Sequence, residues 1–240
     1  MEIAFEKIVE SIAEADKVLV GIGDELAVSF KELAGDKDVD EYEKARILEK
    51  CIHLKQDKAY QVLKDLLQDK DYYLISLNMD SAIHRVFDNR DRLVLPCGDL
   101  SLLQCEKACC KDLYEAKKIP AYPFMDGDVP ECPACQSRMV YNNLYAENYL
   151  EEGYLPAWDS YQNWLKTTVN KKLCIIELGC SLKFPTIIRF AFDKLAMYNK
   201  KATFYRVHES LWQHAKETED RGISIKENAL SFLCKNSEKC

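Results

Sequence analysis

Four cysteines in two close pairs place the strongest constraint on how this chain can fold. Cys105 and Cys109 form the first pair, with Cys110 as an alternative to Cys109, and Cys132 and Cys135 form the second. Cysteine pairs at such spacings predict a zinc site made of four thiolates. Four thiolates leave no open coordination position, so we expect this metal to stabilise the fold rather than to do chemistry.

Composition narrows the class of protein. Of the 240 residues, 48% are hydrophobic and 30% are charged, as in a globular protein with a substantial core. The formal charge of -7 argues against a nucleic-acid or anionic-membrane partner. The chain has no apolar run long enough to span a bilayer, and residues 1–17 have no signal-peptide pattern. We therefore expect a cytoplasmic protein, in which eleven cysteines do not form a disulfide framework.

Apolar runs alternate with segments of helical period along most of the chain. The runs predict strands at 17–23, 71–77, 93–95, 138–142, 172–179 and 202–207. The amphipathic segments predict helices at 2–15, 26–33, 161–169, 186–198 and 230–233, two more within 41–68, and one after Asp80 that runs through Ile83 and Val86. This alternation predicts an α/β fold with a mainly parallel sheet covered by helices on both faces.

Polar residues and glycines follow several of these strands. Gly21 and Gly23 flank Ile22 at the end of the first strand, and Asp24 is placed to cap the next helix. A strand, a Gly-x-Gly turn and a helix bring backbone N–H groups against a phosphate, although a purely structural turn remains an alternative. Asn78 and Asp80 follow the second strand, either as ligand contacts or as helix caps.

These motifs, in this order, resemble the sirtuins, a family of NAD-dependent protein deacylases. Three segments resemble motifs of the NAD-binding part of the family: Gly21-Ile22-Gly23 is similar to its Gly-Ala-Gly loop, Leu77-Asn78-Met79-Asp80 with His84 to Thr-Gln-Asn-x-Asp, and Leu178-Gly179-Cys180-Ser181-Leu182 with Pro185 to Gly-Thr-Ser-Leu-x-x-x-Pro. Cys97-Gly98-Asp99 before Cys105 is similar to the family's His-Gly segment and first zinc cysteine. Cys132-Pro133-Ala134-Cys135 is similar to its second zinc pair.

The resemblance implies a Rossmann-type NAD-binding domain of residues 1–98 and 143–240, with a zinc-binding module of residues 99–142 and NAD between them. It implies catalytic roles for Asn78, Asp80 and Cys97. It also implies cofactor contacts from Gly21, Gly23, Asp24, Asn78, Gly179, Ser181 and His208, where His208 or Arg206 stands for the family's strand-end asparagine.

Two departures from the family pattern bear on the reaction. Cys97 stands where the family has the histidine that acts as general base on a ribose hydroxyl, and the aromatic-arginine pair after the glycine loop has no counterpart near Phe30. Cys97 is open to three interpretations: a nucleophile, a redox-sensitive thiol or a neutral filler. A subgroup of sirtuin-like proteins that lack the histidine is associated with protein ADP-ribosylation.

We therefore expect an NAD-dependent transferase that cleaves the nicotinamide–ribose bond and modifies a protein, either a modified lysine or an ADP-ribose acceptor. The alternative is an inactive module that binds NAD or ADP-ribose.

Overall fold

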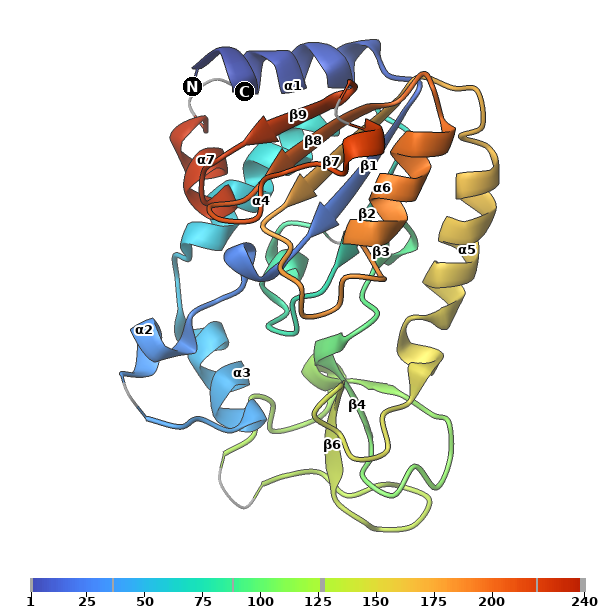
Figure 1. The fold of residues 1–240 in the computed structure, drawn as a ribbon. Helices are drawn as coiled ribbons and strands as arrows, with labels where there is room; N and C mark the ends of the chain where they lie inside the picture. Colours follow the sequence, from blue (N-terminus) through green and yellow to red (C-terminus); the bar gives the residue numbers. More distant parts are fainter. Residues whose placement is uncertain (1, 36, 88, 126–127, 219, 238–240) are drawn as a thin grey trace.

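A six-stranded parallel sheet organises the structure, a computed structural model that describes residues 2–35, 37–87, 89–125, 128–218 and 220–237 (Figure 1). The strand order is β3-β2-β1-β7-β8-β9, and neighbouring strands run parallel throughout. The strands are β1 (Lys17–Ile22), β2 (Tyr72–Ser76), β3 (Leu93–Val94), β7 (Leu173–Leu178), β8 (Thr203–Val207) and β9 (Gly222–Ile225). The predicted α/β class with a Rossmann-like parallel sheet is confirmed.

Helices cover both faces of this sheet (Figure 1). One face packs against α1 (Glu2–Glu14), α4 (Lys55–Leu66) and α7 (Ala229–Lys235). The other face packs against α5 (Leu155–Lys166) and α6 (Arg189–Tyr198). No helix in the described part of the chain is both long enough and apolar enough to cross a lipid bilayer.

The alternation of side chains along β1 shows why both faces are buried. Val18 and Val20 pack into the core on the α1, α4 and α7 side, whereas Leu19 packs on the α5 and α6 side. Successive residues of a strand point to opposite faces, so a strand covered on both sides needs apolar residues at consecutive positions. The continuous apolar runs of the sequence have this origin.

A smaller lobe lies below the sheet in Figure 1 and contains an antiparallel sheet of β5 (Tyr114–Glu115), β4 (Gly98–Cys105) and β6 (Met139–Asn143). The helix α3 (Glu41–Lys50) packs on this lobe: the hydroxyl of Tyr42 donates a hydrogen bond to the Met139 carbonyl, and its ring lies 5.2 Å from that of Tyr141. The predicted zinc-module boundaries at 99–142 stay a prediction.

The helix predicted over 26–33 is wrong in detail. A 3-10 turn, η1 (Asp24–Leu26), is followed by an extended Ala27 (φ -66°, ψ 151°), and the helix α2 spans only Phe30–Ala34. The break follows from Asp80, whose carboxylate accepts the N–H of Val28 at 2.7 Å and so draws this segment out of a helical path.

Other elements also differ from the sequence-based expectation. The segment after Asp80 forms only a 3-10 turn, η2 (Ala82–Arg85), and α5 spans Leu155–Lys166 instead of 161–169. The strands β4, β5 and β9 were not predicted. The strands β8 and β9 are parallel, so the carboxyl end of β9 lies on the same side of the sheet as the predicted cofactor residues.

A buried ion network stands at the carboxyl end of β7. The carboxylate of Glu177 accepts hydrogen bonds from Arg189 at 3.0 Å and from Arg206 at 2.9 Å, and its side chain is fully buried. Burial raises the pKa of Glu177, while the two arginines oppose that rise. The arginines also donate to the carbonyls of Cys180, Leu211 and Gln213, so one carboxylate organises the turns after β7 and β8.

Replacing Glu177→Gln should lower the free energy of unfolding by about 3–5 kcal/mol, because it leaves the guanidinium of Arg189 without its counter-ion and that of Arg206 with Asp193 alone. Urea denaturation followed by circular dichroism measures this loss. Glu10→Gln, the same exchange on the exposed face of α1, should change the value by less than about 0.5 kcal/mol. A loss below about 1 kcal/mol for Glu177→Gln would show that the network is not needed for stability.

Candidate active site

The carboxyl ends of β1 and β7 meet at the point where the strand order reverses. Chain order runs outward from β1 to β2 on one side and from β7 to β8 on the other. The N–H of Gly23 donates to the Leu178 carbonyl at 2.8 Å, which joins the two turns directly. Open α/β sheets bind their ligands at such a switch point. The site is therefore built around the turns at 23–25 and 179–181.

Three predicted cofactor glycines lie in these turns or just before them, and protein atoms fill the space beside each one. A Cβ on Gly21 would lie 2.5 Å from the Ile188 side chain, and a Cβ on Gly23 would lie 2.4 Å from the Cys180 backbone. Gly179 has φ +63°, and a Cβ there would lie 2.4 Å from the Glu25 side chain. These glycines are needed for close packing within the chain itself.

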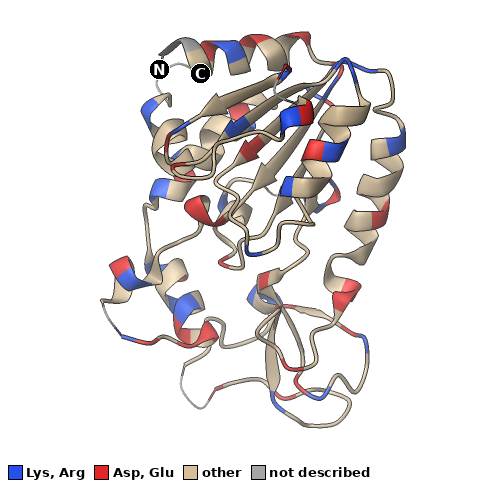
Figure 2. Cartoon of the chain, viewed as in Figure 1, with Lys and Arg blue, Asp and Glu red and all other residues tan. Residues whose placement is uncertain are grey.

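Two carboxylates after β1 accept the main-chain N–H groups of the neighbouring turns. Asp24 accepts the N–H of Ser181 at 3.1 Å. Glu25 accepts the N–H of Glu209 at 2.9 Å and that of Ala229 at 2.8 Å. The turn η1 that carries both carboxylates is red in Figure 2, at the carboxyl edge of the sheet. The donors that a phosphate or ribose would use are thus engaged by the protein, so this half of the crevice does not fit a nucleotide as it stands.

His208 follows β8 beside the same turns. Its Nδ1 lies 3.0 Å from the N–H of Ser210, 3.1 Å from that of Leu211 and 3.0 Å from the Oε1 of Glu25. Its Nε2 is buried without a partner among the described residues. The alternative candidate, Arg206, belongs instead to the Glu177 network.

Asn78 and Asp80 lie on the other side of the crevice, beyond β2. The Nδ2 of Asn78 and the hydroxyl of Tyr60 are both buried, and neither has a partner in good hydrogen-bond geometry within the described residues. The two side chains are neighbours, since Asn78 opposes the rise that burial gives the pKa of Tyr60. An unpaired buried donor of this kind is an unusual feature that a ligand acceptor would satisfy. Asp80 is held by the N–H groups of Val28 and Ala82, and burial raises its pKa in spite of both bonds.

Cys97 is a buried, neutral thiol. Its side chain has no exposed surface, and burial raises its pKa to about 11, with Lys183 opposing the shift. A general base or a thiolate nucleophile needs a pKa near or below neutrality. Of the three interpretations of Cys97, this environment favours the neutral filler.

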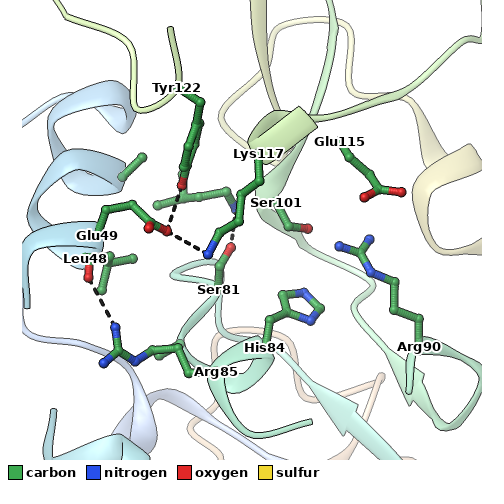
Figure 3. A pocket seen from close by; sticks show the side chains of 13 residues that line it. Leu48, Glu49, Ser81, His84, Arg85, Arg90, Ser101, Glu115, Lys117 and Tyr122 are labelled. Atoms are coloured by element: carbon green, nitrogen blue, oxygen red, sulfur yellow. Dashed lines mark hydrogen bonds and ion pairs between the residues drawn. The ribbon is translucent and has the colours of Figure 1, made fainter. Parts of the chain in front are cut away.

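His84 and Asp99, which the sequence analysis did not link, form a pair beside a cavity. The Nε2 of His84 lies 2.6 Å from Asp99, a buried carboxylate that also accepts the N–H of Ser101. Hydrogen bonds from His84 and Ser101 lower the pKa of Asp99 against the opposing effect of burial. Figure 3 shows the imidazole between Ser101 and Arg90, in a cavity of about 210 Å³. None of the predicted cofactor or catalytic residues lines this cavity.

The four cysteines predicted as zinc ligands converge. The sulfurs of Cys105, Cys109, Cys132 and Cys135 all lie within 4.8 Å of one another. Cys105 is 3.5 Å from Cys135, and Cys109 is 3.5 Å from Cys132. A tetrahedral zinc bound at about 2.3 Å sets its sulfurs about 3.8 Å apart, so the cluster is compatible with zinc. Cys110 stands outside it, with its sulfur 3.9 Å from that of Cys109.

Comparison with known proteins adds two findings. A solved structure described as "The Structural basis of Sirtuin Substrate Affinity" matches 97% of this chain and 98% of its own, with a TM-score of 0.59 and 14% identity. A curated relative from Staphylococcus aureus, "Protein ADP-ribosyltransferase", is 22% identical over 186 residues, which are 73% of this chain and 59% of that protein. The chain thus spans about three fifths of that relative's length.

No protein-family model matches the chain. The fold, by contrast, is matched over 97% of the chain. The chain therefore has the sirtuin fold, with Cys97 at the position where the sequence resemblance puts the family's histidine.

Proposed function

We propose that this chain is a protein-modifying transferase that cleaves the nicotinamide–ribose bond of NAD and passes ADP-ribose to a protein acceptor. The observation that carries the choice of reaction is the buried Cys97, whose pKa of about 11 keeps its thiol protonated. Deacylation needs a base at this position, whereas transfer of ADP-ribose does not. The name of the Staphylococcus aureus relative supports the same choice.

Each candidate residue has a role that its contacts support. Asn78 offers its unpaired Nδ2 to an acceptor such as a carboxamide oxygen. Asp80 is a positioning residue, because it ties the Val28 segment to η2 and so fixes the rim of the crevice. Cys97 fills a fully buried position as a protonated thiol. NAD, when bound, supplies the ribose carbon and its nicotinamide leaving group.

A module that binds NAD or ADP-ribose without turnover is the second candidate. Cys97 supports it, because a protonated thiol stands where the family has its histidine base. The protein acceptor, a modified lysine or another side chain, belongs to the first candidate alone. The cytoplasmic location stays a prediction from the sequence.

Release of nicotinamide from NAD tests the first candidate. Asn78→Ala should lower the rate by about 10²-fold, since one donor to the reacting group is lost. Cys97→Ala should keep the rate within about threefold, because a neutral filler makes no proton transfer. Chromatography of nicotinamide, with candidate acceptor proteins present, gives both rates.

Two outcomes would contradict this account. Release no faster than in Asn78→Ala would leave the binding module as the function. A loss in Cys97→Ala equal to that in Asn78→Ala would return Cys97 to the role of base or nucleophile.

We further propose that zinc occupies the cluster of Cys105, Cys109, Cys132 and Cys135. The cluster joins the end of β4 to the turn before β6, where the N–H of Gln136 donates to the Cys132 carbonyl at 2.8 Å. Hydrogen bonds from Ser137 lower the pKa of Cys135, whereas hydrogen bonds to the other cysteines of the cluster raise that of Cys109. Metal binding requires the thiolate form of all four cysteines.

Metal analysis of two neighbouring variants tests the ligand set. Cys110→Ser should keep about one zinc per chain, as in the wild type, while Cys109→Ser should lose it. Removal of zinc with a chelator should lower the melting temperature, because metal binding to this closed site contributes to folding. Equal zinc loss in both variants would show that Cys110 is a ligand.

A further inference from the structure

A side chain of the protein itself, that of Glu25, lies at the switch point of the sheet. We propose that Glu25 acts as an internal anionic latch: its carboxylate takes the place of a ligand at the ends of β1, β7 and β8, and a nucleotide binds there only when Glu25 is displaced. The nature of the ligand rests on the proposed function. The latch itself rests on contacts within the chain.

The contacts of Glu25 connect three separate parts of the fold. The residue follows β1, the Glu209 N–H that it accepts follows β8, and the Ala229 N–H begins α7. The two N–H groups bind different oxygens, so both ends of the carboxylate are engaged. Only 11% of the side chain is exposed. A carboxylate that accepts main-chain N–H groups from two turns makes the same bonds as a bound anion.

Gly179 shows that this position of Glu25 is built into the fold. The backbone of Gly179 is in the left-handed region at φ +63°, and its missing side chain leaves the space that the Cβ of Glu25 occupies. The N–H of Glu25 donates to the Gly179 carbonyl at 3.2 Å. A glycine at a ligand-binding turn ordinarily lets a phosphate or ribose approach the backbone. Here the approaching group is Glu25.

Charge around the latch opposes a phosphorylated ligand. Asp24 and Glu209 flank Glu25 in the same turns, and the one imidazole in contact with its carboxylate among the described residues is that of His208, at 3.0 Å. A diphosphate placed among these carboxylates meets repulsion that a neutral side chain would not cause. Removal of the Glu25 charge therefore strengthens nucleotide binding in two ways, by freeing donors and by reducing repulsion.

A displaced Glu25 side chain would have space for a second conformation. A cavity of about 980 Å³ lies beside it, between the start of α4 and α7. Lys55 and Lys58 line this cavity together with Glu25. A carboxylate that leaves the turns can thus turn towards two ammonium groups, which compensates in part for the lost N–H contacts.

Calorimetric titration with ADP-ribose tests the latch. Glu25→Ala should bind ADP-ribose at least tenfold more tightly than the wild type. Glu32→Ala is the matched control, since it removes an exposed carboxylate that lines the same cavity, and its affinity should stay within about twofold. Equal or weaker binding by Glu25→Ala would overturn the proposal and make Glu25 a contact of the ligand or a purely structural residue.

Hydrogen exchange tests the same latch without any nucleotide. The amides of Glu209 and Ala229 should both be protected in the wild type, and at least one of them should lose protection in Glu25→Gln, because the glutamine side chain keeps the volume but has only one acceptor oxygen. Unchanged protection would overturn the latch even where nicotinamide release confirms the transferase. Lost protection without tighter ADP-ribose binding would also overturn it, while the transferase is judged by nicotinamide release alone.

Discussion

The Glu177 carboxylate, buried at the end of β7 between two arginines, is the interaction on which the geometry of this crevice depends. Charged groups with so little solvent contact are stable only when their partners are in place. Arg189 and Arg206 use their remaining N–H groups to hold carbonyls in the turns after β7 and β8. The same turns present the N–H groups of Ser181 and Glu209 to the crevice. The buried Glu177 network therefore also fixes the turns that form the candidate site.

The crevice that this unit builds is used differently on its two sides. On the side of β2, the unpaired donor of Asn78 awaits an acceptor, and the thiol of Cys97 is too deeply buried to act as a base. On the side of β7 and β8, the acidic turn after β1 already satisfies the main-chain donors. A sirtuin fold with these two features is suited to a reaction that needs an oriented ribose but no base, under the control of the acidic turn.

The parts of this molecule that follow from local pattern could be predicted from the sequence. Consecutive apolar residues such as Val18, Leu19 and Val20 indicate a strand buried on both faces. Every strand of the large sheet apart from β9 was predicted in this way. The cysteine pairs predicted the four-sulfur cluster, including Cys109 as the nearer ligand. Spacing suffices in these cases because the structure depends on neighbours in sequence.

The remaining features depend on partners far away in the chain. Glu25 finds its donors in residues 209 and 229, and Asp80 breaks a predicted helix by accepting the N–H of Val28. Gly23 and Gly179 were predicted as cofactor contacts because a glycine turn has the same pattern whether a phosphate or another turn approaches it. The pairing of His84 with Asp99 likewise needs the fold, since nothing in the spacing of these residues joins them.

A crystal structure of the protein with ADP-ribose bound tests the central claim most directly. We predict the adenosine half between the Gly179 turn and the turn after β8, with the Glu25 side chain turned away from the Glu209 and Ala229 N–H groups. A structure with ADP-ribose bound at the same turns and Glu25 still holding both N–H groups would contradict this account.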